Sequence, residues 1–206
     1  METNSINQTM AHHFNSMEVV LRTISIKMPK AADGFEEFKV RGSALRHMGV
    51  SIECIANQFR LISEAFKVGD LDAIHGNFVL IASLLEGCSF QLKHFGLSLK
   101  SDHHHMVPAC GAHNPRSPVA ESGFLWEGIS HLFSSLSIQL KNNEYNLNNN
   151  FEVISKNIKN FSDVLGKYRK TMEESDFALS AEHLLTASDK LGTVGESFYK
   201  LSSTLL

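Results

Sequence analysis

The residues best able to bind a metal ion lie in one histidine-rich segment near the middle of the chain. His103, His104 and His105 are consecutive, and Cys110 and His113 follow in a Cys-x-x-His arrangement. Imidazole nitrogens and cysteine thiolates are the usual ligands of zinc. Consecutive histidines point in different directions, however, and surface loops often collect histidines that bind nothing. Two interpretations therefore stay open, a metal site formed by His103, His105, Cys110 and His113, and an ordinary exposed loop.

No other arrangement of residues indicates a catalytic reaction. The chain has no Glu-x-x-His pair of the kind that binds iron in diiron helical bundles. It also has no Gly-x-Ser-x-Gly nucleophile turn and no glycine-rich phosphate-binding loop. Cys110 beside a histidine would need a rigid segment to act as a nucleophile. We therefore expect a protein that is not an enzyme and that uses no cofactor.

Two groups of basic residues are candidates for contact with an anionic membrane surface. Each such charge contributes about 1 kcal/mol when it is held close to anionic lipid. An ordinary solvated helix face has the same pattern, and Glu152 and Asp163 interrupt the second group. The members are Lys39, Arg41 and Arg46 in the first group, and Lys156, Lys159, Lys167, Arg169 and Lys170 in the second.

The overall charge argues against a nucleic-acid partner. The formal net charge is −3 with histidine neutral, whereas a dedicated nucleic-acid-binding protein normally has a strong basic excess. We therefore expect no nucleic acid among the partners.

Long helices must form the framework that positions these residues, because apolar side chains recur at alternating spacings of three and four. Similar runs cover residues 45–66, 147–172 and 184–205, and hydrophobic residues make up 43% of the chain. We expect an all-α fold, an elongated antiparallel bundle of about five helices with coiled-coil-like seams, as one domain over residues 1–206. The clearest run is Leu71, Ile74, Phe78, Ile81, Leu85, Cys88, Leu92, Phe95 and Leu99.

Proline, glycine and asparagine mark the expected ends of these helices. The four prolines fall at position 29 and within 108–118, and proline ends or kinks a helix. The asparagines between 142 and 150 leave open whether 121–172 is one helix or two. The expected segments are a disordered start at 1–8, helices over 9–27, 35–67, 71–100, 121–172 and 177–205, a turn at 28–34, and a mobile loop at 101–120.

Cysteine usage and the first residues indicate the compartment. Cys54, Cys88 and Cys110 show no disulfide-framework spacing, and Cys88 on an apolar seam is expected to be buried. The first residues lack the pattern of a signal peptide, and no run approaches 18 uninterrupted apolar residues. We expect a cytoplasmic protein, with at most peripheral membrane contact.

Part of the chain resembles the BAR superfamily, the helical dimers that curve membranes. The stretches Phe35–Phe66 and Asp72–Glu86 look like the first two helices of such a domain, and Leu191–Leu205 has a similar pattern. The inverse-curved and sorting-nexin branches are the nearest. The resemblance implies a non-enzymatic homodimeric scaffold that associates with anionic membranes, with an assembly seam that includes Phe59, Ile62, Phe78, Ile81 and Leu85. The chain departs from that family in its mildly acidic charge and its shorter helices.

Two other functions stay open. A soluble adaptor could bind an amphipathic helix of a partner protein in a groove between its own helices. A metal-binding helical protein would use the histidine-rich segment. A monomer that ignores lipid would favour the adaptor, and stoichiometric metal would favour the metal-binding protein.

Overall fold

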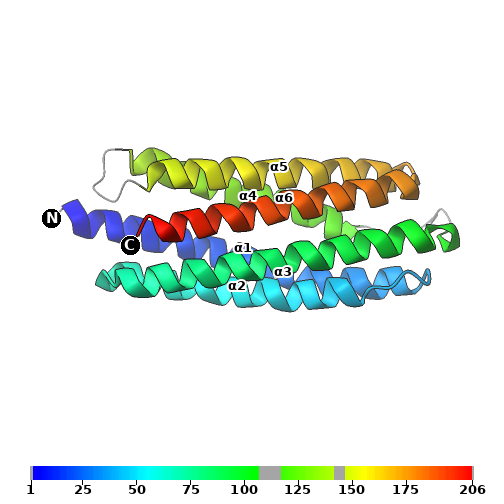
Figure 1. Ribbon diagram of the computed structural model, residues 1–206, viewed down its shortest axis with the longest axis horizontal. Coiled ribbons are helices and arrows are strands. Elements are labelled where there is room, and N and C mark those ends of the chain that lie inside the picture. Colours follow the sequence, from blue (N-terminus) through cyan, green and yellow to red (C-terminus); the bar gives the residue numbers. More distant parts are fainter. Residues whose placement is uncertain (1, 107–116, 142–146, 206) are drawn as a thin grey trace.

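The computed structural model describes residues 2–106, 117–141 and 147–205, and these form six α-helices along one long axis (Figure 1). The helices are α1 (Glu2–Glu36), α2 (Ser43–Val68), α3 (Leu71–Asp102), α4 (Ser117–Gln139), α5 (Asn148–Glu173) and α6 (Phe177–Ser203), with a short 3-10 turn η1 (His103–His105) after α3. The expected all-α, elongated antiparallel bundle is confirmed, with six helices instead of about five.

The helices close into a ring in the order α1, α2, α3, α6, α5, α4, because each packs against the next and α4 packs against α1. The colours in Figure 1 show that each helix runs opposite to both of its ring neighbours. The first three helices form one up-down-up half and the last three form the other. The two halves meet where α3 packs on α6 and where α1 packs on α4.

Phenylalanine fills the centre of this ring. Each helix contributes at least one buried ring to the same cluster, and none of these side chains is more than 2% exposed. The centroid of the Phe14 ring lies 5.5 Å from that of Phe59 and 6.2 Å from that of Phe151, within the range of favourable aromatic contacts. The cluster members are Phe14, Phe59, Phe66, Phe78, Phe133, Phe151 and Phe198.

The turn expected at 28–34 is wrong, because α1 continues through Pro29. A proline inside a helix costs about 3 kcal/mol, since it cannot donate to the carbonyl four residues earlier, here that of Ser25. Burial of apolar residues beyond the proline, such as Phe35, offsets this cost. Gly49 of α2 fits closely here, since a Cβ at that position would lie 3.0 Å from the Ser25 carbonyl oxygen and 3.1 Å from Pro29 Cδ.

Most other helix boundaries follow the signals in the sequence. Gly69 follows the end of α2 in the left-handed conformation with φ of 73°, which glycine adopts without strain. Asp70 then caps α3 by accepting a hydrogen bond of 2.9 Å from Ala73 N. Asp176 caps α6 in the same way, with 3.0 Å to Leu179 N.

Two expected segments differ in extent. Helix α1 begins at Glu2, so the segment 1–8, expected to be disordered, is helical from residue 2. The loop expected at 101–120 is shorter at both ends, because α3 and η1 extend to His105 and α4 begins at Ser117. The run 121–172 forms two helices, α4 and α5, in agreement with the interpretation that placed a turn there.

Cys88 is buried, as its place on the apolar seam predicts. Its side chain is 1% exposed, and burial raises the pKa of its thiol to about 12. The thiol is therefore protonated at neutral pH and acts as a small apolar side chain.

One stretch of the described residues, Leu71–His105, is long and apolar enough to cross a membrane by length and composition alone, with a mean hydropathy of 1.3. The core helix of a soluble protein meets the same criterion. Here the stretch comprises α3 and η1, and the apolar run of α3 faces the core between α2 and α6.

Candidate functional site

A groove of about 640 Å³ lies between α3 and α6, the two helices that join the halves of the bundle. Its volume is within the usual range for binding sites. Small side chains line its floor, so the two helices leave a channel that larger residues would fill. The floor residues are Ala82 and Ser89 from α3 and Gly192 and Gly195 from α6, and the exposed Ser83 and Thr193 also line the groove.

Close contacts between α3 and α6 set the depth of the groove. A Cβ at Gly195 would lie 3.1 Å from the carbonyl oxygen of Ala82, so glycine lets the two backbones approach at this point. Two turns away, Ser89 Oγ donates a hydrogen bond of 2.8 Å to the carbonyl oxygen of Ser188. A Cβ at Gly192 would lie 3.3 Å from Ser89 Oγ. The floor is therefore fixed by backbone packing rather than by flexible side chains.

The rim of the groove is acidic. Glu86 of α3 and Asp189 and Glu196 of α6 line it, together with one lysine, Lys200. None of the three carboxylates forms an ion pair within the residues that the structure describes. With three carboxylates and one lysine, the lining of the groove keeps a net negative charge.

An aromatic side chain stands at one end of the groove. Tyr199 of α6 lines it and is 60% exposed. Tyrosine offers a large, stiff contact surface with a polar tip, which is why it is common among the residues that dominate binding energy at interfaces. An exposed tyrosine above a floor of small residues is typical of a surface that receives another chain.

The residues proposed as metal ligands do not form a site within the described part of the chain. No group of three or more histidine, cysteine, aspartate or glutamate side chains converges there. His103 and His105 lie in η1, and the rings of His104 and His105 are 4.0 Å apart between centroids. Cys110 and His113 lie outside the described residues, so the proposed metal site stays a prediction.

The structure places the first basic group in the turn before α2 and in its first turns. Lys39 and Arg41 precede α2, so the expectation that they lie within a helix is wrong. Arg46 binds Glu36 and Asp33, with N–O distances of 2.5 and 2.6 Å. Its hydrogen bond lowers the pKa of the Glu36 carboxyl. Of the three basic residues in this group, Arg46 is therefore paired with carboxylates of the same chain.

The second basic group lies on α5, and three of its charges also have acidic partners. Lys159 Nζ lies 3.0 Å from Glu127 and 2.6 Å from Asp163. Hydrogen bonds with these carboxylates raise the pKa of the lysine, and the bond with Asp163 has the larger effect. Arg169 pairs with Glu173 at 3.4 Å, and Lys170 with Glu174 at 3.9 Å. Lys156 and Lys167 form no ion pair within the described residues.

The proposed assembly seam lies inside the single chain. All five of its residues have exposures of 2% or less. They pack in the common core of the bundle, so they cannot meet a second copy while the six helices stay closed. The seam residues are Phe59, Ile62, Phe78, Ile81 and Leu85.

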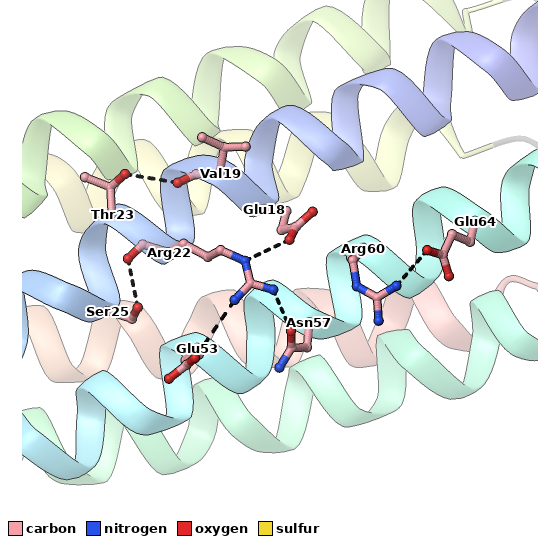
Figure 2. A network of polar contacts seen from close by, with 9 residues as sticks. All are labelled: Glu18, Val19, Arg22, Thr23, Ser25, Glu53, Asn57, Arg60 and Glu64. Atoms are coloured by element: carbon pink, nitrogen blue, oxygen red, sulfur yellow. Dashed lines mark hydrogen bonds and ion pairs between the residues drawn. The ribbon is translucent and has the colours of Figure 1, made fainter.

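A half-buried polar network links α1 to α2 (Figure 2). Arg22 Nε donates a hydrogen bond of 2.8 Å to Glu18, whose side chain is only 11% exposed. Arg22 also donates a bond of 2.7 Å to Asn57 and lies 3.9 Å from Glu53. Because these groups satisfy one another, the network holds α1 against α2 and is not a candidate binding site.

The groove residues were not among those predicted from the sequence. The available signal was the spacing of small residues, with Ala82 and Ser89 seven apart on α3, and Gly192 and Gly195 three apart on α6. Small residues at such spacing on two helices favour a close approach of the backbones. The spacing does not show which helix of the chain packs against which, so the groove cannot be predicted from the sequence alone.

Comparisons of the chain with protein-family models, with curated proteins and with solved structures found no match. Function is therefore inferred from the shape of the bundle and from the charges on its surface.

Proposed function

We propose that this protein is a helical adaptor that binds an amphipathic helix of a partner protein in the α3/α6 groove. The observation that carries the proposal is a groove with a floor of small residues and an exposed tyrosine, running between two long antiparallel helices. Helices commonly recognise a third helix in this way, by receiving its apolar side chains between them.

The length of the groove fits a short helix. It extends along α6 from Asp189 to Lys200, which is about 16 Å at 1.5 Å per residue. A partner helix of about three turns would cover it. The proposal places this protein in the cytoplasm as a non-enzymatic interaction module without a cofactor.

The BAR-like membrane scaffold is a second proposal that the geometry favours less. The elongated helical bundle and the unpaired Lys156 and Lys167 support it. Against it, the residues proposed for the dimer seam are buried in the single chain and three of the basic residues on α5 pair with carboxylates. Light scattering and sedimentation with anionic liposomes at low salt separate the two, since the adaptor is expected to be monomeric and to stay in the supernatant.

The test of the adaptor uses the full chain and a set of amphipathic helical peptides of about 14 residues that share one apolar face. A tryptophan at Ser83 would fill the groove, whereas a tryptophan at Ser98, also on α3, lies outside it. We expect peptide binding by the wild type and by Ser98→Trp, measured by fluorescence anisotropy, and at least a tenfold loss in Ser83→Trp. Equal binding by the two variants would contradict docking in this groove.

A further inference from the structure

Three carboxylates stand on the rim of the α3/α6 groove. Many carboxylates elsewhere in the helices bind a lysine or arginine of the same chain, as Glu53 does with Arg22 and Glu182 with Lys100, although others, such as Asp72 and Glu152, form no ion pair within the described residues. Glu86, Asp189 and Glu196 have no such partner within the described residues. Like charges brought together on one concave surface repel one another, so this arrangement is unfavourable for the free protein.

A smaller hollow between α4 and α5 shows the contrast. Glu127 and Asp163 line it, and both bind Lys159 at 3.0 and 2.6 Å. Arg169 in the same hollow lies over the Phe124 ring, 4.9 Å from its centroid. This hollow is charged but internally neutralised, whereas the α3/α6 groove is not. The free carboxylates therefore distinguish the α3/α6 groove from that hollow.

The positions of the three carboxylates are regular. Asp189 and Glu196 are seven residues apart on α6, so they lie on one face about 10 Å apart along the helix axis. A Cβ at Gly195 would lie 3.5 Å from the backbone nitrogen of Glu86. Glu86 therefore stands across the groove from the segment that joins the two α6 carboxylates.

We infer that the partner is a basic amphipathic helix that carries lysine or arginine at two positions seven residues apart. Its apolar or small side chains between those positions face the floor formed by Ala82, Gly192 and Gly195. Its two basic residues pair with Asp189 and Glu196, and a third basic residue between them reaches Glu86. The inference rests on the proposed function, because it specifies the partner of the same groove.

Two other occupants fit the groove less well. A second copy of this chain would bring the same three carboxylates to the contact and would be repelled. A divalent cation would need several ligands around one point, and no group of three or more potential ligands converges in the described residues. A basic helix avoids both problems. Its charges are opposite to those of the groove, and they are spread along an axis in the same way as the carboxylates.

The test compares three peptides of about 14 residues that differ only at the three rim-facing positions, which all carry lysine, glutamine or glutamate. A fourth peptide has the composition of the lysine peptide in scrambled order. Exposed charge pairs contribute modestly, so three of them predict that the lysine peptide binds about tenfold more tightly than the glutamine peptide at low salt. In the variant Glu86→Gln/Asp189→Asn/Glu196→Gln the two peptides should bind equally, and the affinity for the glutamine peptide should stay that of the wild type.

The outcomes separate this inference from the proposed function. Equal binding of the lysine and glutamine peptides by the wild type, together with sensitivity to Ser83→Trp, would overturn the basic partner and leave the groove as a docking site. A preference for lysine that survives in the triple variant, or that the scrambled peptide shares, would also overturn it. Binding of none of the peptides would overturn both.

Discussion

Replacing Gly195 with alanine tests whether α3 and α6 are as close as the structure shows. Alanine in a helix interior is favoured over glycine by about 1 kcal/mol. At Gly195, however, the new methyl would lie 3.1 Å from the Ala82 carbonyl oxygen and 3.4 Å from Leu85 Cβ. A backbone oxygen cannot rotate away, so the helices must move apart, and overpacking of this kind costs about 1–3 kcal/mol. We expect Gly195→Ala to lower the free energy of unfolding by about 0–2 kcal/mol.

Gly87 provides the matched control on α3. It is exposed, and no atom lies within 4 Å of the position its Cβ would occupy. Gly87→Ala should therefore raise the free energy of unfolding by up to about 1 kcal/mol through helix propensity alone. Urea denaturation of the two full-length variants, followed by circular dichroism, measures the difference, which we expect to be about 1–3 kcal/mol. A Gly195→Ala variant stabilised as much as Gly87→Ala would refute the close packing of α3 and α6.

Three further predictions concern stability. Phe14→Ala removes a ring from the centre of the phenylalanine cluster and should cost about 3–5 kcal/mol by urea denaturation, whereas alanine at Phe90, which is 59% exposed, should change stability by less than about 0.5 kcal/mol. Arg22→Met leaves the buried Glu18 carboxylate without its partner and should cost about 1–2 kcal/mol, discounted because Arg22 is 39% exposed; the double variant with Glu18→Met should recover part of the loss. Burial lowers the pKa of His183 from its ordinary value of 6.5, so below that pH the unfolded chain takes up a proton more readily than the folded one and stability falls as the pH falls. The free energy of unfolding should therefore drop more between pH 7.5 and pH 5.5 in the wild type than in His183→Gln, and an equal drop in the two would contradict the assignment.

The helices could be predicted from the sequence because their apolar residues follow a regular spacing. The run from Leu71 to Leu99 belongs to one helix, and Gly69 and Asp70 separate it from α2 as their conformational preferences predict. The turn expected at 28–34 is wrong because the local cost of a proline is visible in the sequence, whereas the compensating burial of Phe35 depends on helices far away in the chain.

The candidate site was harder to predict for the same physical reason. A spacing of three and four shows that a helix has a buried face, but it does not show whether the covering helix belongs to the same chain. The sequence therefore suggests a dimer seam for Phe59, although this residue packs inside the single chain. The groove depends on the register of α3 against α6, which Gly195 and Ala82 reveal only when the two helices are placed together.

The alternating directions of the six helices have an electrostatic consequence. Each helix carries a dipole that is positive at its N-terminus, and in this ring every helix lies beside two that point the other way. The backbone dipoles therefore largely cancel, and the bundle as a whole has little net backbone dipole. A charged partner that approaches from a distance is guided by side chains alone, and such guidance weakens as added salt shortens the screening length.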